Sequence, residues 1–92
     1  MIKEKALYSC YLSDFKCKYY ITQTNKTFKE SGDSISSFGI KIDMLSLEDN
    51  IKDSAALQHV GINENDVKEY IRNLYNGQAL PCELKTMEMN AI

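Results

Sequence analysis

The chain has little of what several common functions require. Ten of the eleven basic residues among its 92 residues are lysine, and Arg72 is the only arginine. Because arginine supplies the bidentate contacts to phosphates and to base edges, this bias argues against duplex nucleic acid as a partner. No apolar run reaches the length of a signal-peptide core or of a membrane span. We therefore expect a cytoplasmic protein with no membrane contact.

Signatures of catalysis and of cofactor binding are also missing. The three cysteines, an odd number, indicate reduced thiols rather than a disulfide framework. Gly32 and Gly61 are isolated, so they form no phosphate-binding loop. The acidic run at 48–53 lacks the alternating oxygen ligands and central glycine of a calcium loop. We expect that the protein is not an enzyme and needs no cofactor.

The cysteines and the single histidine leave two alternatives open. Zinc accepts three sulfurs and one nitrogen, and the chain can offer only Cys10, Cys17, His59 and Cys82, without the close cysteine spacing that forms half of such a site. Cys82 and His59 could also form a thiol nucleophile and its base, although their spacing matches no known signature. The plainer interpretation is that the cysteines are small buried hydrophobic residues.

What the chain does have is a period-two apolar pattern over its first 47 residues, which is typical of strands. We place strands near 5–12, 16–24 and 37–45. A two-residue loop at Ser13-Asp14 would put the following pairs opposite one another on one apolar face: Leu12/Phe15, Cys10/Cys17, Tyr8/Tyr19 and Ala6/Ile21. The sequence therefore predicts a hairpin with one sealed face.

The pattern changes in the second half of the chain. Residues 47–54 are expected to form a polar linker, and 55–62 fits a short fourth strand better than a helical turn. A helix is expected from Asn63, its N-cap, to Gly77, which would supply a left-handed stop. The apolar residues of this helix have helical spacing: Val67, Tyr70, Ile71 and Leu74. Pro81 is expected to open a second helix.

These elements predict one α+β domain over 1–92, β-rich over 1–62 and helical over 63–90. The sheet has three or four antiparallel strands in a meander. Two short helices then pack on one face, because that arrangement buries the apolar side of every element. Two residues would be the buried pair of the second helix: Leu84 and Met87.

The opposite face of the hairpin is more apolar than a solvated sheet needs to be. It is expected to display Tyr11, Lys16, Lys18, Tyr20 and Leu7. Tyrosine is a good strand residue, but it is also enriched at protein interfaces. The leading hypothesis is a small binding module that acts through protein contacts or self-association as a homo-oligomer. Adaptors, regulators and phage-type inhibitors of host defence are of this class.

A second hypothesis assigns the same face to a small anionic ligand. Tyr11 and Tyr20 would stack on a nucleobase, while Lys16 and Lys18 would neutralise its phosphates. A chain this short has little room for a cleft, so the site would lie between protomers. The protein would then sequester nucleotides.

Residues 17–84 also resemble an uncharacterised family of short clostridial-type proteins, a domain of unknown function. Three motifs carry the resemblance: the strand Ser37-Phe38-Gly39-Ile40-Lys41-Ile42, the pair Asp53-Ser54, and the helix end Leu74-Tyr75-Asn76-Gly77 followed by Pro81 and Leu84. The chain departs from the family pattern where such proteins carry Ser-Pro and then His-Leu, because it has Leu80-Pro81 and then Glu83-Leu84. The resemblance implies no known activity.

Overall fold

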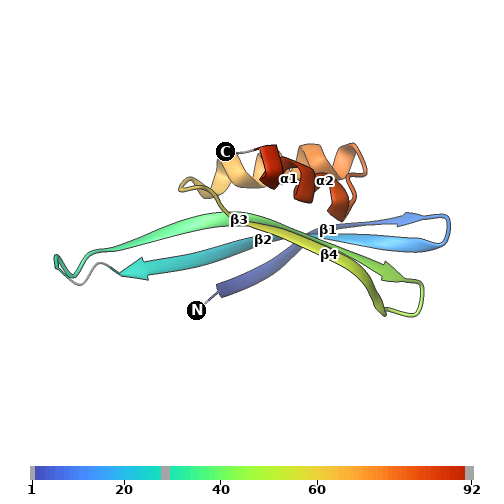
Figure 1. Ribbon diagram of the computed structural model, residues 1–92, viewed down its shortest axis with the longest axis horizontal. Coiled ribbons are helices and arrows are strands. Elements are labelled where there is room, and N and C mark those ends of the chain that lie inside the picture. Colours follow the sequence, from blue (N-terminus) through green and yellow to red (C-terminus); the bar gives the residue numbers. More distant parts are fainter. Residues whose placement is uncertain (1, 28–29, 91–92) are drawn as a thin grey trace.

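The computed structural model describes residues 2–27 and 30–90 (Figure 1). Its elements are β1 (Ile2–Leu12), β2 (Phe15–Thr27), β3 (Ser34–Ser46), β4 (Ile51–Gly61), α1 (Glu64–Asn76) and α2 (Pro81–Asn90). The four strands form one antiparallel sheet in the order β1-β2-β3-β4, so every strand pairs with its neighbour in the chain. The expected α+β meander followed by two short helices is confirmed.

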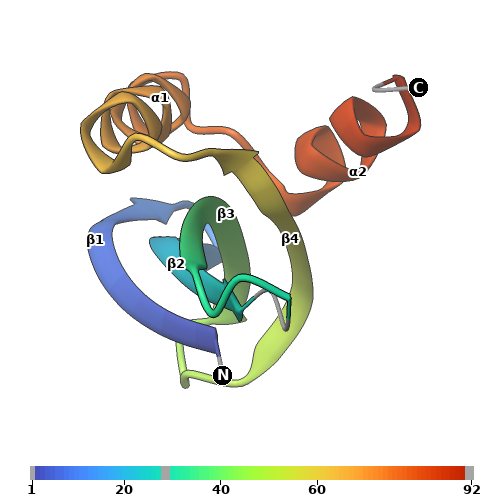
Figure 2. The ribbon, with the colours of Figure 1, turned by 90° about the vertical axis from the view of Figure 1, so that its left-hand side faces the viewer.

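Both helices lie on the same side of the sheet, which we call the helix-bearing face (Figures 1 and 2). α1 contacts all four strands, whereas α2 contacts β3 and β4. The opposite side, the helix-free face, is concave, because β1 and β4 curve away from the helices (Figure 2). Neither helix in the described part of the chain is long and apolar enough to cross a membrane.

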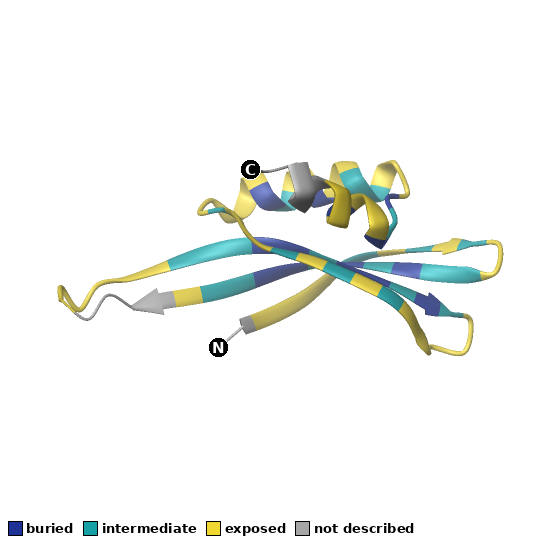
Figure 3. Ribbon diagram, viewed as in Figure 1, coloured by how far each residue is buried: buried dark blue, intermediate teal, exposed yellow. Residues whose placement is uncertain are grey.

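The core lies between the helix-bearing face and the helices, as the dark blue segments of Figure 3 show. Its buried residues come from β2, β3, both helices and the connection between the helices: Cys17, Tyr19, Ile21, Ile40, Ile42, Val67, Ile71, Ala79 and Leu84. The predicted burial of Leu84 is confirmed, whereas the side chain of Met87 lies outside the described residues. One core therefore joins the sheet to both helices.

The hairpin of β1 and β2 has the predicted turn at Ser13-Asp14. The predicted pairs Leu12/Phe15, Cys10/Cys17 and Tyr8/Tyr19 are confirmed. This register holds from Leu12 back to Tyr8, so the apolar pairs nearest the turn fix it.

The predicted pair of Ala6 with Ile21 is wrong, because a β-bulge interrupts β1 between Ala6 and Tyr8. Ala6 pairs instead with Tyr20, and Lys5 pairs with Ile21. A bulge inserts one unpaired residue, so side chains on its two sides change faces relative to regular alternation. Lys5 therefore shares the helix-bearing face with buried Ile21.

The strands are longer than the apolar pattern indicates. β2 and β3 pair without interruption from Phe15/Ser46 to Thr27/Ser34. β4 begins at Ile51, so the expected linker over 47–54 is wrong and only 47–50 forms the connection. Polar residues at 52–54 concealed the start of β4, because Asp53 occupies a half-buried position where the apolar pattern would need an apolar residue.

The ends of the helices follow capping rules. Asn63 is the N-cap of α1, and its side-chain Oδ1 accepts hydrogen bonds from the backbone N–H groups of Asn65 (3.0 Å) and Asp66 (3.2 Å). Pro81 is the first residue of α2, as predicted. The side chain of Glu83 accepts a hydrogen bond from the N–H of Leu80 at 3.2 Å, which caps this second helix.

The predicted left-handed stop at Gly77 is wrong, because the φ of Gly77 is −87°. The next residue, Gln78, takes that conformation with φ 53°. Backbone N–H groups then donate from Gln78 to the Tyr75 carbonyl and from Ala79 to the Leu74 carbonyl, both at 3.0 Å. This is the Schellman pattern, in which the left-handed residue is the one after the cap. Here the glycine occupies the cap itself.

Candidate functional site

The predicted binding residues lie together on the helix-free face, with one correction. Tyr11 pairs with Lys16, and Lys18 and Tyr20 follow at alternate positions of β2. Leu7 does not belong to this face, because it is the bulged residue and packs against the core cluster. A bulge leaves no mark in a single sequence, so regular alternation placed Leu7 on the wrong side.

Lys16 is held by an acidic residue of its own chain. Only 13% of its side chain is exposed, and its Nζ forms an ion pair with Asp49 in the connection between β3 and β4. The hydrogen bond to Asp49 raises the pKa of Lys16, and the same contact lowers the pKa of the Asp49 carboxyl. The positive charge of Lys16 is therefore largely neutralised within the molecule.

Tyr20 lies under a second ion-pair network. The Nζ of Lys41 is 5.3 Å from the centre of the Tyr20 ring and 3.0 Å from the Glu4 carboxylate. The same Nζ is 3.8 Å from Asp43. Burial raises the pKa of the Tyr20 hydroxyl. Because this network joins residues of β1, β2 and β3, spacing along the chain could not reveal it.

Inner strands are buried even on this face, because the sheet curls around them. Asp43 is buried and accepts a hydrogen bond of 2.5 Å from the Ser54 hydroxyl. Thr22 and Leu45 are also buried, although Leu45 is not part of the core cluster between sheet and helices. The open part of the helix-free face is therefore much smaller than the alternation of β2 indicated.

Large apolar side chains remain exposed at the end of the sheet that carries the turns β1–β2 and β3–β4 (Figure 1). One rung crosses all four strands there, through Tyr11, Lys16, Leu45 and Ile51. Tyr11 is 74% exposed and Ile51 65%, and Leu47 in the adjacent connection is 58% exposed. We call Tyr11 on edge strand β1, Ile51 on the opposite edge strand β4, and Leu47 in the connection before β4 together the turn-end patch. The sequence does carry a signal for this patch: Leu47 and Ile51 are large apolar residues in the otherwise polar segment 47–54.

Tyrosines on the helix-bearing face have a structural role. The rings of Tyr8 and Tyr75 stack with centres 4.7 Å apart, and Tyr19 meets Tyr75 edge-on at 5.8 Å. The buried Tyr19 hydroxyl donates a hydrogen bond of 2.8 Å to the Ala79 carbonyl. These contacts tie the hairpin to α1 and to the connection that follows it.

The cysteines are free thiols in three environments. Cys17 is fully buried, Cys10 is partly buried and Cys82 is exposed on α2. Burial raises the pKa of the Cys17 thiol to about 11. A thiol with such a pKa is protonated at neutral pH, so Cys17 is not a nucleophile there.

The candidate zinc ligands do not form a cluster. Cys10 and Cys17 face each other, but no three metal-ligating side chains come together within residues 2–27 and 30–90. His59 shares a hydrogen bond of 2.7 Å with the Ser37 hydroxyl through its Nδ1. No hydrogen bond joins His59 to Cys82 in the described part of the chain. Within the described ranges, the candidate ligands therefore form no assembled metal or thiol centre.

Comparisons of the chain with protein families, with characterised proteins and with solved structures find no match. The resemblance to the clostridial-type family therefore stays a prediction.

Proposed function

We propose that this chain is a non-enzymatic protein-binding module whose contact surface is the turn-end patch. The observation that supports this proposal is the exposure of the Tyr11, Leu47 and Ile51 side chains at one end of the sheet. Single exposed apolar residues are common on soluble proteins, but groups of them, aromatic residues above all, characterise contact surfaces. Adaptors, regulators and small inhibitors of the phage type all act through such contacts.

The partner that we propose for this surface is a second copy of the chain. Lys16 and Asp49 place opposite charges side by side at the patch. In a two-fold symmetric contact the same surface meets itself, and a surface whose charges are already paired does not repel its copy. A stable interface buries about 800 Å² per partner, more than three side chains provide. We therefore expect weak association that depends on concentration.

Sedimentation equilibrium from micromolar to millimolar concentrations tests this proposal. The wild-type mass should rise with concentration, whereas the double variant Tyr11→Ser, Ile51→Ser should stay monomeric. The matched control is Ile35→Ser, Ile62→Ser, which removes two exposed isoleucines elsewhere and should associate like the wild type. A wild-type chain that is monomeric throughout, or a control that loses association equally, contradicts the proposal.

The nucleotide alternative receives less support from the same geometry. Lys41 lies over the Tyr20 ring, and Lys16 is paired with Asp49. Tyr20 is four residues from Lys16, the partner of Tyr11, a separation of about 13 Å along a strand. One base cannot contact both tyrosines of one chain. Protein contact is therefore the function that we favour.

A further inference from the structure

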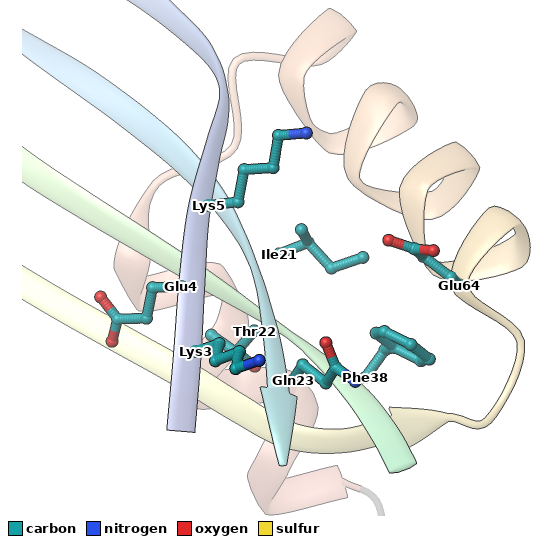
Figure 4. Close-up of a pocket in the computed structure, with 8 residues that line it drawn as sticks. All are labelled: Lys3, Glu4, Lys5, Ile21, Thr22, Gln23, Phe38 and Glu64. Atoms are coloured by element: carbon teal, nitrogen blue, oxygen red, sulfur yellow. The ribbon is translucent and has the colours of Figure 1, made fainter. Parts of the chain in front are cut away.

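A groove lies between β1 and the beginning of α1 on the helix-bearing face, away from the turn-end patch (Figure 4). Its volume is about 380 Å³, within the range of small-molecule sites. The lining residues come from three strands and α1: Lys3, Glu4, Lys5, Ile21, Thr22, Gln23, Phe38 and Glu64. The groove is thus large enough for a small organic molecule.

The bulge in β1 places both lysines of this groove on the helix-bearing face. Because Lys5 pairs with Ile21 and Lys3 pairs with Gln23, both lysines share a face with buried Ile21. Gln23 pairs in turn with Phe38 of β3. Figure 4 shows Lys5 pointing toward α1, with Ile21 and Phe38 between β1 and the helix. The groove has an apolar floor with two ammonium groups along its β1 side.

Within residues 2–27 and 30–90, neither of the two lysines has an acidic partner. Ion pairs hold Lys16, Lys41, Lys68 and Lys85 to carboxylates. Lys3 and Lys5 form no ion pair with any residue that the structure describes.

The acidic residues of the groove are already engaged elsewhere. Glu4 points away from the groove (Figure 4) and pairs with Lys41 at 3.0 Å. Glu64 faces the groove and lies 3.5 Å from Lys68. The unpaired charge at this site is therefore positive.

We propose that the groove binds a small organic anion with an apolar body. The body packs on Ile21 and Phe38, and the ammonium groups of Lys3 and Lys5 attract the anionic group. Glu64 lies on the opposite wall, and its ion pair with Lys68 limits its repulsion of the anion. This site goes beyond the proposed protein contact, because it uses another face and another end of the sheet.

Two dyes that share an apolar body and differ in charge test the proposal: anilinonaphthalene sulfonate, an anion, and phenylnaphthylamine, which is neutral. The anion should bind the wild-type chain more tightly. The variant Lys3→Ala, Lys5→Ala should weaken binding of the anion by roughly five- to tenfold, because it removes two exposed charge contacts. Its affinity for the neutral dye should equal that of the wild type. The control Lys52→Ala, Arg72→Ala removes the same charge elsewhere and should bind like the wild type.

Amide chemical shifts locate the dye, and thermal unfolding confirms that each variant is folded. Shifts should concentrate at residues 3–5, 21–23 and 38. The proposal is overturned if neither dye binds, if both variants weaken the anion equally, or if the shifts cluster at Tyr11 and Ile51. That last result would show dye binding to the turn-end patch, so the two surfaces are tested separately.

Competition against the bound dye separates two sources of the ligand. Displacement by a medium-chain fatty acid indicates an aliphatic carboxylate, and displacement by adenosine monophosphate indicates an aromatic phosphate. Failure of both to compete at millimolar concentration counts against a natural anion at this site.

Discussion

Tyr19 joins the sheet to the connection between the helices through one buried hydrogen bond. Tyr19→Phe keeps the ring but leaves the Ala79 carbonyl without this donor. An unpaired buried carbonyl costs about 1–3 kcal/mol, so we expect urea unfolding to show a loss of that size. The control Tyr11→Phe alters an exposed ring and should leave the midpoint unchanged. Equal midpoints for Tyr19→Phe and the wild type would contradict the contact.

The C-terminus of α1 provides a prediction at two adjacent residues. Gln78 is left-handed and Gly77 is not. Gln78→Gly should stabilise the protein by about 1 kcal/mol, because glycine adopts positive φ without steric cost. Gly77→Ala should change the free energy of unfolding by less than about 0.5 kcal/mol, since the new Cβ would be 3.6 Å from its nearest neighbour. Chemical denaturation that shows a large loss for Gly77→Ala would instead place the left-handed residue at Gly77.

The thiols provide a prediction about pH. Burial raises the pKa of Cys17 to about 11 from an ordinary value of 9.0. Between these pH values the native state keeps this proton while the unfolded chain releases it. The contribution of the Cys17 thiol to stability is therefore full below pH 9.0 and is lost as pH rises toward 11.

At neutral pH, Ellman's reagent should label exposed Cys82 quickly and Cys17 only on unfolding. Rapid labelling of Cys17 in the folded protein would contradict its burial.

At the scale of elements, the backbone of β4 leaves no room for a side chain at Gly39 of β3. A Cβ at this position would overlap the Leu57 carbonyl oxygen and come within 2.7 Å of the Gln58 Cα. Gly39→Ala should therefore force the strands apart and destabilise the protein by about 2 kcal/mol or more, measured by thermal unfolding. Gly61→Ala is the control, because its Cβ would meet only the Val67 side chain at 3.5 Å. Equal stability of the two variants would contradict the pairing of β3 with β4.

Much of this architecture could be predicted because local signals agreed with one another. The turn at Ser13-Asp14 and the apolar pairs beside it specify the hairpin register, and Asn63 and Pro81 mark the starts of the helices. The bulge at Leu7 could not be predicted, since any residue can occupy it and regular alternation is the default.

The candidate site was harder to predict than the fold, because its properties depend on distant residues. Tyr11, Lys16 and Tyr20 were placed on the correct face. Their partners Asp49 and Lys41 come from other elements, and they remove two side chains from the open surface. The curl of the sheet is a property of four strands together, so a single strand pattern could not indicate how much of the face is covered.

At the scale of the whole molecule, the two proposed surfaces lie at different places on the sheet. The turn-end patch is apolar and lies beside the Lys16–Asp49 ion pair, whereas the groove beside β1 carries unpaired positive charge. Lysines at 3 and 5 on an edge strand also discourage pairing of that edge with another sheet. Association through the turn-end patch and binding in the groove should therefore be independent of each other.

The central claim is that copies of this chain meet through the turn-end patch, and amide chemical shifts recorded at increasing protein concentration test it most directly. We expect concentration-dependent shifts or broadening at Tyr11, Leu47 and Ile51, with no change at Lys3, Lys5 or Phe38. Spectra that do not change with concentration, or changes confined to other residues, would contradict the claim.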